Sequence, residues 1–231
     1  MSTTLTAAQE SAIRDWLAAH PTLSVGVGDA ESACSVAAIN LALSGTLTDN
    51  VPDCMSPVIG RWVINVQDEM PATIRDSDAW RDLLPLAAGT GQAHESERLA
   101  LVLDWMWGTV LPLVQPIADR RGFGEAWRQM CAERTAGAAY AAKAAVDAAH
   151  AAFDAANEAA NEAAYNAAYA AAYAGGAAAA FSAATAAPAA NAAACAAYAA
   201  DDYADAWATL DPVGLLRRLI AVTDPRALEG P

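Results

Sequence analysis

Alanine occupies most positions between Thr135 and Ala200, and this bias restricts the possible folds more than any other feature of the 231-residue chain. Alanine has the highest helix propensity and loses no side-chain entropy on folding, so the segment predicts long α-helices. Its methyl group buries little surface, however, and forgoes about 1.5–2 kcal/mol per site relative to a buried leucine. We therefore expect the Trp- and Leu-rich residues before Thr135 to supply most of the folding free energy.

A periodic stripe of other side chains interrupts the alanines. Equivalent positions return every eleven residues in two series: Asp147, Glu158 and Tyr169, and Lys143, Asp154 and Tyr165. An eleven-residue repeat corresponds to about 3.67 residues per turn, so the stripe runs nearly straight along a helix. Because small side chains let helices approach closely, we expect the alanine faces to pack against other helices. The stripe is then left to face water or a partner.

Gly175-Gly176 divides the alanine-rich segment and predicts the turn of an antiparallel helical hairpin. After this turn the stripe continues at Phe181, Thr185, Pro188, Asn191, Cys195, Tyr198, Asp202 and Asp205. Pro188 predicts a kink in the second helix, because proline cannot donate a backbone hydrogen bond.

Local signals before Thr135 predict a series of helices. Thr6 and Gln9 indicate a capping box, and Pro21 ends the helix that follows. Asp29 is predicted to cap a helix that extends to about Leu43. Ser56 and Pro57 form a favourable N-cap and N1 pair for the next helix. Further helices are predicted over residues 77–86 and 99–110, with breaks at Pro112 and Pro116.

The chain ends with Asp211 and Pro212 as the predicted N-cap and N1 of a short helix. Together these patterns predict an all-α fold, a helical bundle with a long alanine-rich antiparallel helical hairpin and a short C-terminal capping helix. The predicted parts are a mixed-composition helical core over residues 1–135, the hairpin over 136–210, and the capping helix with its tail over 211–231.

Charge and cysteine usage restrict the possible partners. A net charge of −14 and a pI near 4.4 argue against nucleic acid and anionic membranes, because phosphate recognition needs clustered Lys and Arg. The most apolar run, Leu99–Val114, is shorter than the roughly 20 residues that span a bilayer, and a buried helix fits it better. No signal peptide is predicted. Four widely spaced cysteines without a CxxC motif indicate reduced thiols and a cytoplasmic protein.

Few residues suggest chemistry. Asp147 and His150, followed by carboxylates on one helix face, look like half of a carboxylate-bridged di-metal site. No second Glu-x-x-His motif exists in the sequence, so a solvated polar face is the preferred interpretation. Cys34 follows Asp29 and Glu31, whose charges oppose a reactive thiolate, which favours a buried structural cysteine. No catalytic residue, cofactor or metal is predicted.

The segment AAYAAKAAVDAAHAAFDAANEAANEAAYNAAYAAAYAGG resembles the type I antifreeze proteins, which are alanine-rich helices with an eleven-residue period. The resemblance implies a flat ice-binding face, on which that family places threonine at the recurring position. Here the stripe instead holds Asp, His, Glu, Asn and Tyr, and Thr185 is the only threonine in the alanine-rich tract. Charged side chains bind liquid water strongly, which works against ice binding.

The leading functional interpretation is a non-enzymatic interaction or assembly protein that presents the stripe to a protein partner or to another copy of itself. Tyrosine is typical of recognition surfaces because its ring is large, rigid and amphipathic. The same rings could instead fill the space between the hairpin and the first part of the chain. The residues predicted to bind a partner are Asp147, His150, Asp154, Glu158, Tyr165, Tyr169, Tyr173 and Tyr198. Two alternatives stay open: an ice-binding protein, and an enzyme of unknown class that uses Cys34 or His94.

Overall fold

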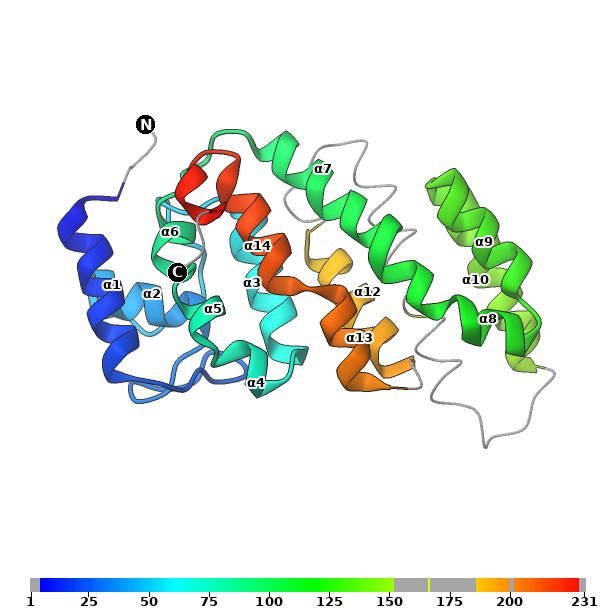
Figure 1. The fold of residues 1–231 in the computed structure, drawn as a ribbon, viewed down its shortest axis with the longest axis horizontal. Helices are drawn as coiled ribbons and strands as arrows, with labels where there is room; N and C mark the ends of the chain where they lie inside the picture. Colours follow the sequence, from blue (N-terminus) through cyan, green and yellow to red (C-terminus); the bar gives the residue numbers. More distant parts are fainter. Residues whose placement is uncertain (1–4, 152–165, 167–185, 200–201, 229–231) are drawn as a thin grey trace. The chain divides into compact units, whose positions relative to one another are not determined.

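A computed structural model describes residues 5–151, 166, 186–199 and 202–228 (Figure 1). In this part of the chain every regular element is helical, apart from one isolated β-bridge between Gly28 and Ala33. The fold is therefore all-α, as predicted. The chain divides into two compact units, residues 1–101 with 212–231, and residues 102–211. The change in composition near Thr135 falls inside the second unit.

In the first unit, α1 (Ala7–Ala19) begins at the predicted capping box. The backbone N–H of Gln9 donates to Thr6 Oγ1 at 3.3 Å, and the backbone N–H of Thr6 donates to Gln9 Oε1 at 3.0 Å. Ile13 and Leu17 are buried on one face of α1, and the helix packs against α2 (Ser35–Ser44) and α6 (Leu84–Ala88). Reciprocal capping satisfies two backbone donors that the first turn leaves without partners.

The predicted start of the second helix is wrong. Asp29 does not cap it; its Oδ1 accepts hydrogen bonds from the backbone N–H groups of Glu31 and Ser32, which closes a local turn beside the Gly28–Ala33 bridge. Such local side-chain bonds compete with helix formation. Helix α2 begins only at Ser35, with Cys34 as its N-cap.

Helix α3 (Pro57–Glu69) follows the prediction, with Ser56 as the N-cap and Pro57 in the first turn. Its apolar residues at helical spacing are all buried: Val58, Ile59, Trp62, Val63 and Val66, followed by Met70. These side chains belong to the buried core of the first unit.

The helix predicted over residues 77–86 is instead two short helices, α5 (Asp78–Arg81) and α6, after the single turn of α4 (Ala72–Arg75). Pro85 explains the break, because it has no N–H to donate to the carbonyl of Arg81. Ser77 is the N-cap of α5, and its Oγ accepts from the backbone N–H of Trp80 at 3.2 Å. Gly89 ends α6.

Helix α14 (Pro212–Ala221) completes the first unit from the other end of the chain. Its buried side consists of Leu215, Leu216, Leu219 and Ile220. It packs against α3 and α6 (Figure 1).

Helix α7 (Glu95–Trp105) continues through a π-helical turn, η1 (Met106–Val110), and a 3₁₀ turn, η2 (Leu111–Val114), into α8 (Gln115–Arg121). Pro112, one of the predicted breaks, lies in the 3₁₀ turn η2, whereas Pro116 lies in the first turn of α8. Among the described residues, this 27-residue run is the one helix long and apolar enough to cross a membrane by length and composition, and 44% of its most apolar stretch is buried within the protein. Core helices of soluble proteins meet the same criterion.

In the second unit, α9 (Gly124–Glu133) packs against both α8 and α10 (Ala136–Ala151). Helix α12 (Ala186–Ala199) packs against η1, η2 and α13 (Tyr203–Leu210). Two buried tryptophans bind backbone carbonyls: Nε1 of Trp105 donates to Leu210 and Nε1 of Trp127 to Leu111, each at 2.7 Å. The predicted turn at Gly175-Gly176 lies outside the described residues, and a kink at Pro188 stays a prediction.

Candidate functional site

Helix α12 separates buried alanines from an exposed edge of other side chains. The alanines at 189, 190, 192, 193, 194, 196 and 197 are all buried. Between them, Asn191 is exposed, Pro188 and Cys195 are half-buried, and the side chain of Tyr198 is 62% exposed. We call these four residues the α12 stripe. Their steps of three and four residues are those predicted from the sequence, and the helix turns them away from the packed face.

Helix α10 divides its described side chains less sharply. Ala139, Ala142 and Val146 are buried on one face, while Ala141 and Ala144 are exposed and Tyr140 is 54% exposed. One face that contains alanines therefore packs inward in α10, but other alanines of this helix face outward. Small side chains suit this role because they allow close backbone approach.

The structure describes only one of the side chains predicted to bind a partner, that of Tyr198. Asp147 and His150 lie in α10, but their side chains are outside the described part. The remaining predicted residues, Asp154, Glu158, Tyr165, Tyr169 and Tyr173, also lie outside the described residues. Their grouping with Tyr198 on one surface stays a prediction.

A short aromatic ladder connects Tyr198 to the interior of the second unit. Its ring lies 5.4 Å from that of Tyr203, measured between centroids, and Tyr203 meets the buried ring of Trp207 edge-on at 6.2 Å. Aromatic pairs in such tilted and edge-on arrangements gain about 0.5–1.5 kcal/mol beyond their buried area. The contact with Tyr203 therefore restricts the conformations of the exposed Tyr198 ring, which lowers the side-chain entropy that Tyr198 would lose on binding a partner.

A cavity of about 200 Å³, here called the α13 cavity, lies in the same unit. Its lining residues are Leu113, Pro116 and Ile117 from η2 and α8, and Asp202, Asp205, Ala206 and Thr209 at α13. Asp202 is the N-cap of α13, and its Oδ1 accepts from the backbone N–H groups of Ala204 at 2.9 Å and Asp205 at 3.1 Å. The sequence shows the acidic side of this cavity, since residues 202, 205 and 209 share one helix face. The apolar residues of the cavity precede the acidic ones by about ninety positions in the sequence, and no sequence pattern predicts that the two groups meet.

A second cavity, of about 310 Å³, lies in the first unit. It is lined by Arg14, Leu17, Ala18, Asp78, Arg81, Asp82 and Pro85. Arg14 is paired with Glu10 at 3.0 Å, and Arg81 donates to the carbonyl oxygens of Leu17 and His20. Because two arginines and two aspartates line it, this cavity favours neither a positively nor a negatively charged ligand.

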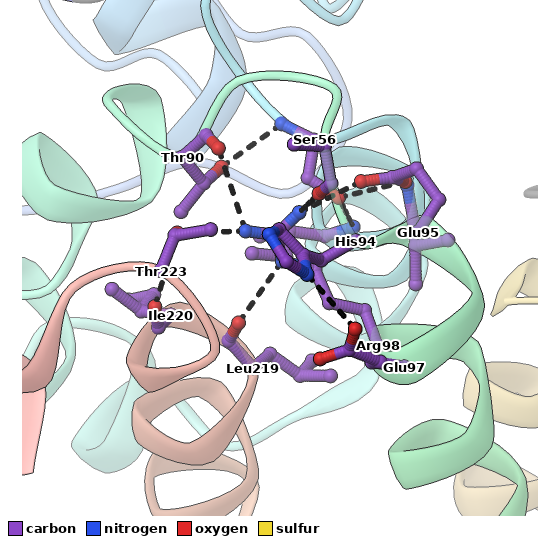
Figure 2. Close-up of polar contacts among 12 residues, drawn as sticks. Ser56, Thr90, His94, Glu95, Glu97, Arg98, Leu219, Ile220 and Thr223 are labelled. Atoms are coloured by element: carbon purple, nitrogen blue, oxygen red, sulfur yellow. Dashed lines mark hydrogen bonds and ion pairs between the residues drawn. The ribbon is translucent and has the colours of Figure 1, made fainter.

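The most extensive polar cluster of the first unit surrounds Arg98, which is fully buried in α7 (Figure 2). Its guanidinium donates to the Leu219 carbonyl at 3.1 Å, Glu95 Oε1 at 2.8 Å, Thr223 Oγ1 at 2.8 Å, the Thr90 carbonyl at 3.4 Å and the Ala93 carbonyl. These bonds use all five N–H donors of an arginine. Burial lowers the pKa of Arg98, while its hydrogen bond to Glu95 raises it in part.

Glu95 extends this cluster to the start of α3. Its Oε2 accepts from Ser56 Oγ at 2.9 Å and from the backbone N–H of Val58 at 3.0 Å. A carboxylate at this position also meets the positive end of the α3 dipole. Neither contact could be predicted from the sequence, because Ser56 and Val58 lie 39 and 37 residues away from Glu95 in the chain. Because the donors of Arg98 are all satisfied within the protein, we interpret the cluster as a structural link between α3, α7 and α14.

The two residues named for the enzyme alternative, Cys34 and His94, have different surroundings. Cys34 is buried at the N-cap of α2, and its Sγ accepts from the backbone N–H of Ala37 at 3.4 Å, so the prediction of a buried cysteine is confirmed. Burial raises the pKa of its thiol, which disfavours the nucleophilic thiolate. Nδ1 of His94 lies 2.8 Å from the carboxylate of Glu97 at an exposed position.

All four cysteines are free thiols. Among the described residues, no group of three or more His, Cys, Asp or Glu side chains is placed to hold a metal ion. Comparison with protein-family models, with curated proteins and with solved structures found no match to this chain. A functional inference therefore depends on the chain's own side chains.

Proposed function

We propose that this chain is a non-enzymatic interaction or assembly protein. It presents the α12 stripe, together with the acidic and tyrosine residues predicted to continue it on an alanine-rich helical hairpin, to a protein partner or to a second copy of itself. The proposal includes a cytoplasmic location, which the four free thiols support.

The observation that carries the proposal is the separation of side chains on α12. Every alanine from 189 to 197 is buried, so the alanine face is already used in folding. Among the residues that differ from alanine, Pro188 and Cys195 are half-buried, whereas Asn191 and the large side chain of Tyr198 are exposed. Tyrosine is strongly enriched among the residues that dominate binding energy at protein interfaces.

The support beneath Tyr198 strengthens this interpretation. The ring of Tyr198 contacts that of Tyr203, and Tyr203 contacts Trp207. These contacts restrict the conformation of the Tyr198 side chain in the unbound protein. Pre-organised side chains avoid an ordering cost of about 0.5–1.5 kcal/mol each on binding. The strongly negative net charge favours a basic partner over an acidic one.

Site-directed photocrosslinking tests the proposal. A photoreactive phenylalanine analogue replaces Tyr198 in the full chain, and the matched control places it at Val25, which is 58% exposed in the first unit. We expect a discrete crosslinked product in the native cell from position 198 and none from position 25. Light scattering after size exclusion, over a wide concentration range, then distinguishes self-assembly from binding to another protein. A monomer at all concentrations with no product specific to position 198 would refute the proposal.

A further inference from the structure

The α13 cavity combines an apolar wall with a pair of carboxylates. Leu113, Pro116 and Ile117 supply the apolar side, and Asp202 and Asp205 supply the charge. Both aspartates are exposed. No ion pair to either of them occurs within the part of the chain that the structure describes. Within the described residues, the cavity therefore places two exposed carboxylates next to apolar surface.

The volume of the cavity indicates whether it suits a small-molecule ligand or a single side chain of a protein partner. Sites for small molecules usually measure about 300–1,000 Å³. At about 200 Å³ the α13 cavity is smaller than this range, and it suits one long side chain better than a whole ligand. A side chain with an apolar stem and a cationic end matches both walls.

We propose that the α13 cavity receives an arginine side chain of a basic protein partner. The aliphatic stem lies along Leu113, Pro116 and Ile117, and the guanidinium pairs with the carboxylates of Asp202 and Asp205. Arginine fits better than lysine because its planar fork binds two acceptors at once, whereas an ammonium acts as a point charge. This inference rests on the proposed function and specifies the chemistry of the partner.

The position of the cavity agrees with that role. Asp202 immediately precedes Tyr203, whose ring centroid lies 5.4 Å from that of the exposed Tyr198, so this carboxylate and the end of the α12 stripe lie near each other in the same unit. Only Oδ1 of Asp202 is engaged in capping, which leaves Oδ2 for a ligand. A partner that contacts Tyr198 can therefore place one arginine in the cavity.

The test uses the full chain and blocked peptides with a single central residue in a Gly-Ala background. Arginine, lysine and neutral citrulline versions are titrated at low salt, and the methyl resonances of Leu113 and Ile117 are followed. We expect saturable shifts with the arginine peptide, weaker binding of the lysine peptide and no shift with citrulline. Absence of saturation, or equal shifts with citrulline, would overturn the inference.

Variants separate a specific contact from general charge attraction. The Asp202→Asn, Asp205→Asn double variant keeps a good N-cap, because asparagine caps as well as aspartate. It should bind the arginine peptide about tenfold more weakly, as expected for the loss of two exposed charge pairs. The control Asp15→Asn, Glu31→Gln changes net charge equally in the first unit and should bind as the parent does. Equal weakening in both double variants would show non-specific attraction and refute the cavity as the site.

The two proposals fail in different ways. If crosslinking from position 198 succeeds while the peptide titration fails, the interaction function stands and the arginine pocket is rejected. If the titration succeeds and crosslinking fails, the cavity binds arginine but the α12 stripe is not the partner surface.

Discussion

Nε of Arg98 donates to the carbonyl oxygen of Leu219 at 3.1 Å, although 121 residues separate the two positions in the chain. The bond joins α7 to α14 within the first unit, and the same guanidinium also binds the hydroxyl of Thr223. A single side chain thus connects the C-terminal helix to the loop at Thr90 and, through Glu95, to the start of α3. The buried position of this arginine makes the connection sensitive to substitution.

Arg98→Met should destabilise the protein by about 3–5 kcal/mol. The change leaves the carboxylate of Glu95 without its cation and three backbone carbonyls without a donor, and breaking a buried pair from one side costs this much. Arg218→Met, at an exposed position of α14, should change the free energy of unfolding by less than about 0.5 kcal/mol. Urea unfolding of both variants measures the difference, and similar values for the two would show that the Arg98 cluster carries little stability.

Ser56→Ala should cost about 1–2 kcal/mol. The hydroxyl of Ser56 caps α3 through the N–H of Ile59, and it donates to Glu95. Removal of an N-cap alone costs about 1 kcal/mol. Ser11→Ala, at an exposed position in α1, is the control and should be neutral or slightly stabilising because alanine favours helix. A thermal or urea transition unchanged by Ser56→Ala would contradict the structural account of this cap.

Much of the helical pattern could be predicted because its causes are local. The capping box at Thr6 and the Ser56-Pro57 start each depend on residues within one turn. The prediction that Asp29 caps the second helix was wrong, because Asp29 instead closes a turn beside the Gly28–Ala33 β-bridge. The Arg98 cluster could not be predicted at all, because Leu219 and Thr223 reach it only through the tertiary fold. Only part of the α13 cavity could be predicted, for the same reason. Its acidic residues are close together in the sequence, whereas its apolar residues are distant from them in the sequence and reach them only through the tertiary fold.

The thiol of Cys131 should react slowly with disulfide reagents at pH 8. Burial raises its pKa to about 11, with Arg134 acting in the opposite direction. The thiolate fraction at pH 8 is then on the order of 10⁻³, compared with about 0.2 for a free cysteine of pKa 8.5. A variant with Cys131 as the sole cysteine should label on the order of 100-fold more slowly when folded than in urea. The labelling rate should rise with pH up to about 11; a plateau near pH 8.5 would be incompatible with the raised pKa.

The same reagent distinguishes Cys34 from an active-site thiol. Its sulfur is buried and accepts a backbone hydrogen bond, so labelling requires local opening of the start of α2. A variant with Cys34 as the sole cysteine should label no faster than the opening rate allows, and more slowly than free cysteine. Labelling faster than free cysteine would revive the enzyme alternative that uses this residue.

Folding uses the alanine face of α12 and turns its stripe away from the packed face, and two leucine substitutions on this helix test this arrangement most directly. Ala193 is fully buried and Asn191 is exposed, only two positions away. Ala193→Leu should lower the free energy of unfolding by about 1–3 kcal/mol, because a close-packed face cannot accept added methylene groups. Asn191→Leu should change it by less than about 0.5 kcal/mol. Equal effects of the two substitutions on the urea transition would contradict the claim.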